Sequence, residues 1–195
     1  MNNKTMDKDL DKDMDKNIDT IYSYFWNNHN NVFQLIDGDI KYKDTILHSF
    51  SNIIDYCELG YINNWIITQK GYICVIFIMS IFIKYKYLFN KEKYLYDEKT
   101  LYFIEMGISD YYKKLNVYEK ILIINVYANS ENLQNQFIAK NLLSKINKTP
   151  DIIKYAHKIN KNIIILQKYN RFPIRNNYLD RASSLDEIDY LDSIC

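Results

Sequence analysis

The chain has 195 residues, of which 48% are hydrophobic and 25% charged, and its formal net charge is +1. These values fit one globular domain, and they lack the basic footprint that nucleic-acid binding usually leaves, so we expect no nucleic-acid partner. Only 4 glycines and 2 prolines are present. Because sheets need turn residues at every corner, this scarcity favours long helices with tight connections. The 19 tyrosines indicate an AT-rich genome.

The cysteines form no disulfide or metal-binding pattern. Cys57, Cys74 and Cys195 are scattered and include no C-x-x-C pair, which argues against a disulfide framework and against a zinc site. The 3 histidines lie far apart in the sequence, so no metal triad is predicted. We therefore expect no cofactor and no metal. A reducing compartment and the absence of a visible secretory signal predict a cytoplasmic location, in the host if the source is viral.

The N-terminal segment is strongly charged. Residues 7–16 alternate aspartate with lysine and include few apolar side chains. Such a segment buries too little apolar surface to offset the entropy lost on ordering. We therefore predict a disordered charged tail over residues 1–16 and a single helical domain over residues 17–195.

Two helices are predicted in the first third of the domain. The first covers residues 18–26. The second begins near Lys43 and carries apolar residues at helical spacing, among them Phe50, until Gly60 stops it.

Residues 72–83 form a continuous apolar run that ends at Lys84. A membrane-spanning helix needs roughly 20 apolar residues, so the run is too short to span and we predict a helix buried on all sides. Thr68 is its expected N-cap. A membrane segment remains a distant alternative.

Capping signals mark the remaining helices. Asp97 and Ser130 are predicted N-caps, and Phe137 is expected to face inward from the helix after Ser130. Residues 116–119 and 184–187 each resemble a capping box, and residues 149–150 read Thr-Pro, a strong helix start. The sequence therefore predicts an all-α domain of stacked helical hairpins with about eight helices.

The C-terminal motif resembles a known family. Residues 169–176 read Y-N-R-F-P-I-R-N and are followed by Leu179, Arg181 and Glu187. This series resembles the F-G-R-F-P-H-R-N motif, and the residues after it, of the bacterial family called domain of unknown function 924. The resemblance extends over roughly residues 21–191, with weaker matches at residues 65–71 and 130–136. It implies a tetratricopeptide-like helical fold and no established function.

Several family positions differ in this chain. The family motifs carry histidine at the positions of Asn129, Asn162 and Ile174, and they read D-Q-F-P-R-N where residues 80–85 read S-I-F-I-K-Y. If relatives run chemistry through those histidines, this chain has lost its acid–base group. We interpret it as a divergent member, of viral origin, whose scaffold outlived any activity.

The candidate binding residues cluster around the arginine-rich loop. Arginine presents a planar donor fork suited to carboxylate or phosphate, so the loop could form an anion pocket. Alternatively, its arginines hold the loop on the bundle by bonding acids and helix C-terminal carbonyls. The candidates are Arg171, Arg175, Arg181, Asn176, Ser130, Glu131, Asn129 and Asn162.

Two functions remain open from the sequence. The leading hypothesis is a non-catalytic protein-interaction module, because stacked helical hairpins present a groove for a peptide or helix. The alternative is a small-molecule or anion-binding protein, or a degenerate enzyme, with its site around the Arg171–Arg175 loop. The position of Glu131 relative to that loop distinguishes the two.

Overall fold

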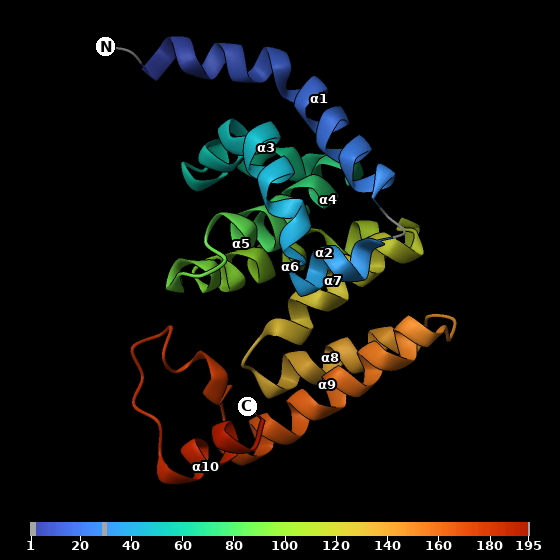
Figure 1. Ribbon diagram of the computed structural model, residues 1–195. Coiled ribbons are helices and arrows are strands. Elements are labelled where there is room, and N and C mark those ends of the chain that lie inside the picture. The colour runs from blue at the N-terminus through green and yellow to red at the C-terminus, as the bar shows by residue number, and fades with distance from the viewer. Residues whose placement is uncertain (1–2, 29–30, 195) are drawn as a thin grey trace.

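The computed structural model describes residues 3–28 and 31–194, with side chains from residue 14 onward (Figure 1). Every regular element in these residues is helical, which confirms the predicted all-α fold of about eight helices. The α-helices are α1 (Asn3–Asn27), α2 (Val32–Asp37), α3 (Lys43–Glu58), α4 (Gln69–Phe77), α5 (Ile83–Lys86), α6 (Asp97–Tyr111), α7 (Val117–Asn129), α8 (Leu133–Leu143), α9 (Pro150–Tyr169) and α10 (Leu185–Ile194).

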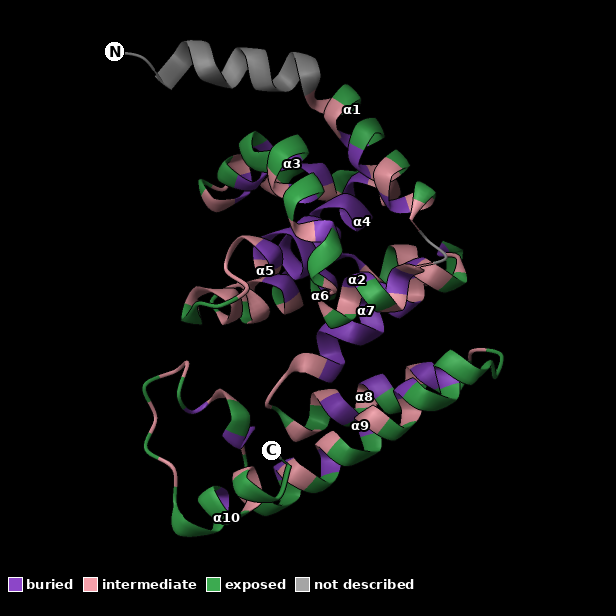
Figure 2. Ribbon diagram, viewed as in Figure 1, coloured by how far each residue is buried: buried purple, intermediate pink, exposed green. Residues whose placement is uncertain are grey.

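The core is built around α4 and α7. Residues 71–77 of α4 and residues 121–128 of α7 are all buried, as their continuous apolar runs predict (Figure 2). The two helices contact each other, and α1 and α6 pack against α4. No helix in the described residues is long and apolar enough to cross a bilayer.

The helix that starts with α4 continues through a wider turn. Residues Ile78–Phe82 form a π-helical segment and lead directly into α5. All five side chains of the segment are buried, and the Ser80 hydroxyl donates a hydrogen bond to the Ile76 carbonyl at 2.6 Å. π-Helical turns inside α-helices are rare and occur frequently at functional sites.

The helices α8, α9 and α10 form a separate layer of the molecule (Figure 1). α7, α8 and α9 pack consecutively, with α8 lying along α9 (Figure 1). After α9 the chain forms a loop and then α10, which contacts the short helical turn Pro173–Arg175. This arrangement brings the loop back toward the end of α7.

Most predicted helix starts are confirmed. The Thr68 hydroxyl accepts from the Gly71 N–H at 3.1 Å, and Thr149 accepts from the Ile152 N–H at 3.3 Å. Asn116 and Glu119 form the expected capping box. Side chains that accept these amide protons satisfy donors that a helix start would otherwise leave unpaired.

Three local predictions are wrong. Asp97 is the first residue of α6 rather than its cap, because its carboxylate is occupied by Lys84 and Arg175. Ser130 follows α7, and Asn132 caps α8 instead, accepting from the Gln134 N–H at 2.8 Å. Phe137 is 45% exposed, since Gln136 takes the inward position.

The sequence analysis also missed α2, a six-residue helix that ends at Gly38 with φ +79°. The backbone of the charged N-terminal segment is helical from Asn3, so α1 begins well before the helix predicted over residues 18–26. Its division from the domain at residue 16 stays a prediction. Cys195 lies outside the described residues.

Candidate functional site

Arg171 fixes the C-terminal helix to the loop. Its Nε and Nη2 donate to the two carboxylate oxygens of Glu187, each at 2.7 Å, and Nη2 also donates to the Ala182 carbonyl at 2.9 Å. Glu187 also accepts from the Ser184 N–H at 2.8 Å, which completes the predicted capping box. These bonds from Arg171, with the Ser184 amide, lower the pKa of Glu187 to about 2 against the opposing effect of burial. Arg171 is therefore a structural latch.

Arg181 forms an equivalent two-pronged ion pair with Glu131. Its Nη1 and Nη2 donate to the two Glu131 oxygens at 2.9 Å each, and the Phe172 N–H donates to Glu131 Oε1 at 2.8 Å. Burial alone raises the pKa of Glu131, but these hydrogen bonds and the positive charges of Arg175 and Arg181 outweigh it and lower that pKa. Glu131 therefore stays ionised and holds the loop against the start of α8.

Arg175 is the most buried of the three arginines, with a side chain 11% exposed. Its Nη2 donates to the Asn129 carbonyl at 2.6 Å, and its Nη1 lies 3.4 Å from Asp97 Oδ2. The guanidinium also lies over the Tyr94 ring, 4.4 Å from the ring centre. Arg175 thus joins the C-terminal end of α7 to the loop between α5 and α6.

The candidate asparagines and Ser130 make local bonds near the end of α7. Asn162 Nδ2 donates to the Ala128 carbonyl at 2.9 Å, and Asn129 Nδ2 donates to Asn125 Oδ1 at 3.1 Å. Ser130 Oγ accepts from Asn135 Nδ2 at 2.9 Å. Asn129 and Asn162 each keep a second amide N–H for another acceptor, because an amide nitrogen carries two.

Asn176 is fully buried within the loop. Its Nδ2 donates to Ser183 Oγ at 3.0 Å, and its carbonyl accepts from the Arg181 N–H at 2.9 Å. These contacts shape the loop itself rather than a surface.

The candidate residues therefore do not converge on one point. Arg175 lies between two hollows, while Arg171 and Arg181 line neither of them. The hollow that includes Ser130 and Glu131 carries three carboxylates in all and one arginine. An excess of negative charge makes this hollow unsuited to an anion.

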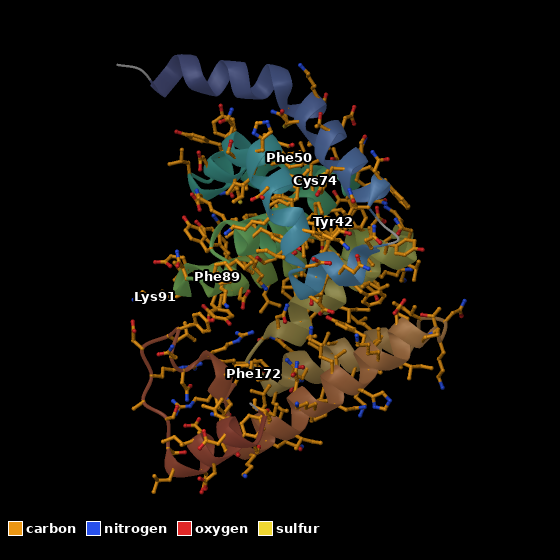
Figure 3. The ribbon with its side chains drawn as sticks, in the orientation of Figure 1. Tyr42, Phe50, Cys74, Phe89, Lys91 and Phe172 are labelled. Atoms are coloured by element: carbon orange, nitrogen blue, oxygen red, sulfur yellow. The ribbon has the colours of Figure 1, made fainter. Side chains whose placement is uncertain are left out.

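The second hollow is a basic cleft of about 420 Å³ between the N-terminal helices and the C-terminal layer. It is lined from α2, the π-helical segment, α5, α9 and the arginine loop, and Figure 3 places Phe172 where the loop meets the helices above it. Its walls carry five cations and a single acid, Asp37. The cations are Lys84, Lys93, Lys158, Lys161 and Arg175.

Two of these cations share one carboxylate, and a third has none among the described residues. Lys84 Nζ lies 3.1 Å from Asp97 Oδ1, and Arg175 uses the other oxygen. Lys93 Nζ lies 3.9 Å from the centre of the Tyr178 ring and has no carboxylate partner among the described residues. Burial lowers the pKa of Lys93, and the charges of Arg175 and Lys84 lower it further. We call Lys84, Lys93 and Arg175 the cation cluster.

Sequence analysis missed Lys84, Lys93 and Tyr94. Lys84 carried a detectable signal, because it occupies the arginine position of the D-Q-F-P-R-N motif that residues 80–85 replace. Lys93 and Tyr94 lie in a short helical turn, Lys91–Tyr94, in which one lysine looks like any other. No group of histidine, cysteine, aspartate and glutamate suited to a metal ion occurs in the described part of the chain.

A family model described as "Bacterial protein of unknown function (DUF924)" matches residues 21–194. The chain belongs to this family. A solved structure of the protein of unknown function ATU0120 from Agrobacterium tumefaciens superposes with a TM-score of 0.72 over 87% of this chain and 99% of that one. Its sequence identity is 14%, so the likeness shows the fold alone. No curated protein matches the chain.

The DUF924 motif positions come together in the basic cleft. Asn129, Asn162 and Ile174 stand where the motifs carry histidine, and all three line it. Ser80 and Lys84, from the segment that replaces D-Q-F-P-R-N, line it as well. Motif positions that are far apart in sequence thus meet in this cleft.

Proposed function

We propose that this protein is a non-catalytic binding module that holds a small anionic ligand in the basic cleft. The observation that carries the proposal is the cation cluster, in which Lys84 and Arg175 share the single carboxylate of Asp97, while Lys93 beside them has no carboxylate partner among the described residues. An anion placed among them relieves the repulsion between like charges, and it gains charge-assisted hydrogen bonds.

The remaining polar groups of the cleft suit the same ligand. Asn129 and Asn162 offer amide donors, and both are oriented by bonds to α7. A few convergent polar groups in a concave site are typical of small-molecule sites, and a volume of about 420 Å³ falls in their usual range.

The loss of the motif histidines supports binding over catalysis. A general acid or base works best with a pKa near the operating pH. Asn129, Asn162 and Ile174 cannot titrate, and burial raises the pKa of Tyr94 above its ordinary value. These three positions therefore supply no acid–base group to the cleft.

Titration calorimetry with inorganic phosphate and with citrate tests the proposal. We expect Lys93→Gln to weaken binding by at least tenfold, because a hydrogen bond to a charged group contributes about 1.5–3 kcal/mol. Lys91→Gln is the matched control: Lys91 lies two residues away, pairs with Asp180 and does not line the cleft. Equal affinity of both variants and the wild type, or no binding of either anion, would exclude the proposal.

A second candidate is the protein-interaction module. An apolar hollow of about 430 Å³ lies between α8 and α9, and Ile153 on its wall is 48% exposed. Lys140 and Lys148 also line it, so we expect an amphipathic helical peptide with acidic flanks. As part of this second candidate we also propose that the hairpins stack as in tetratricopeptide proteins and that the protein is of viral origin.

A labelled acidic amphipathic peptide tests this candidate. Ile153→Asp should abolish binding to the α8–α9 hollow, whereas the same change at Ile164, an exposed α9 residue outside the hollow, should leave it intact. Binding that survives Ile153→Asp would rule the hollow out.

A further inference from the structure

We infer that the ligand of the basic cleft is amphiphilic, with a carboxylate or phosphate head in the cation cluster and an aliphatic chain along the rest of the cleft. This inference rests on the proposed function and names the class of ligand. It follows from the part of the cleft that the cations do not occupy.

The walls beyond the cation cluster are largely apolar. They come from four separate parts of the chain: the end of α2, the helix through α5, α9 and the arginine loop. The apolar side chains that carry the argument are Ile36, Ile81, Leu88, Ile165, Pro173 and Ile174. A small polar anion held in the cation cluster would leave the exposed part of this apolar surface, such as Ile174, in contact with water.

One apolar side chain shows that this surface is uncovered. Ile174 is 62% exposed although it directly precedes Arg175, which is almost entirely buried. The neighbouring Pro173 is buried and starts the short helical turn that holds both residues. The turn therefore fixes Ile174 at the rim of the cleft, one residue from a cation that binds the head group.

A head group in the cation cluster has an apolar path beside it. Lys84 extends from the same continuous helix as Ile81, three residues earlier, and both side chains line the cleft. Arg175 and Ile174 are adjacent in the loop. The head and the first carbons of a chain can thus be contacted from both sides of the cleft at once.

The other two cations of the cleft, Lys158 and Lys161, do not compete with the cation cluster for the head group of the ligand. Lys158 lies 3.0 Å from Asp37 Oδ1, so its charge is compensated at the opposite wall. Lys161 is exposed and has no ion-pair partner among the described residues, which leaves it hydrated at the surface. The uncompensated, partly desolvated charge is that of the cation cluster.

Calorimetry with the wild-type protein and a chain-length series tests the inference. We expect the affinity to rise about fourfold for each methylene from butyrate to hexanoate to octanoate, because each CH₂ that leaves water contributes a fixed increment. Octyl phosphate should follow the same trend, and its affinity relative to octanoate identifies the preferred head. Octanol, which has the chain without the charge, should bind at least tenfold more weakly than octanoate.

A pair of variants locates the chain. Ile174→Ser should weaken octanoate binding at least threefold and leave inorganic phosphate unchanged. Ile164→Ser is the control, since Ile164 is 65% exposed on α9, next to Ile165, but does not line the cleft. Both replaced side chains are exposed, so both variants should fold, and unchanged melting temperatures check this.

The outcomes separate this inference from the proposed function. Phosphate binding with no dependence on chain length would overturn the amphiphilic ligand and leave anion binding standing. Failure of every anion to bind would remove both. Octanol binding as tightly as octanoate would overturn the role of the cation cluster.

Discussion

Arg171 and Glu187 form a two-pronged ion pair across the C-terminal loop, with both N–O distances at 2.7 Å. The Glu187 side chain is only 3% exposed, although it belongs to the first turn of the last helix. Because α10 also places Tyr190 and Ile194 on the wall of the basic cleft, this pair holds one side of the cleft in place.

The Arg171–Glu187 pair makes stability depend on acid pH. The folded-state pKa of Glu187 is lowered from its ordinary 4.5 to about 2. As the pH falls, Glu187 therefore binds its proton in the unfolded chain before it does so in the folded protein. The contribution of the ion pair to folding stability is complete above about pH 5 and is lost as the pH falls from about 4.5 to 2. Glu187→Gln should cost about 1 kcal/mol at pH 7, less than the full shift implies, because Arg171 is 31% exposed and water screens the pair.

Urea unfolding from pH 7 down to pH 3 measures this effect. Asp186→Asn is the control, because Asp186 is the adjacent carboxylate of the same helical turn and makes no ion pair among the described residues. A Glu187→Gln variant whose stability falls with pH as steeply as that of the wild type would contradict the assignment.

Gly71→Ala should destabilise the protein by about 3 kcal/mol or more. A Cβ at this position would lie 2.1 Å from the carbonyl oxygen of Trp65, a backbone atom that cannot move aside without disturbing the turn before α4. Overpacking of this kind usually costs 1–3 kcal/mol, and a backbone clash belongs at or above the upper end. Thermal unfolding measures it, and Ser109→Ala on the exposed face of α6 provides a neutral comparison.

Phe50→Ala should cost about 3–5 kcal/mol, whereas Phe137→Ala should cost less than about 1 kcal/mol. Phe50 is 5% exposed and stacks on Phe82 at 4.7 Å, so its loss leaves a cavity in the core. Phe137 is 45% exposed. Similar unfolding free energies for the two variants would contradict the observed orientations of α3 and α8.

Cys57 and Cys74 should resist alkylation in the folded protein. Both thiols are buried, and burial raises the pKa of Cys57 to about 12 and raises that of Cys74 as well. Little reactive thiolate forms at neutral pH, and reagent has no access. Iodoacetamide labelling followed by peptide mapping should modify both residues only in denaturant; rapid labelling of either one in buffer would show that the core opens.

The helices were predictable because their signals are local. The periodic apolar residues of α3 and α9, the continuous apolar runs of α4 and α7, and the Thr-Pro start of α9 each act within a few residues. Predictions failed where a residue distant in sequence binds the side chain that carries the local signal. Asp97 looked like a cap, but Lys84 and Arg175 bind its carboxylate.

The site was less predictable because its charges balance through tertiary contacts. Arg171, Arg175 and Arg181 looked alike in sequence, yet Arg171 and Arg181 each pair with a glutamate and only Arg175 reaches the cleft. Lys93 gains its role from the approach of Arg175, 82 positions later. Neither the arginine–glutamate pairs nor the approach of Arg175 to Lys93 can be predicted from residue spacing or periodicity.

The wide turn at Ile78–Phe82 has a consequence for how this cleft can diverge. Each α-helical residue rotates the chain by about 100°, and a π-helical turn accommodates one additional residue without breaking the helix. Loss of that residue would rotate Lys84 out of the cleft, and it would turn Tyr85 away from the Asp39 carbonyl to which it now donates at 3.0 Å. An insertion or deletion in this single turn would therefore change which side chain faces the basic cleft, although the rest of the sequence stays the same.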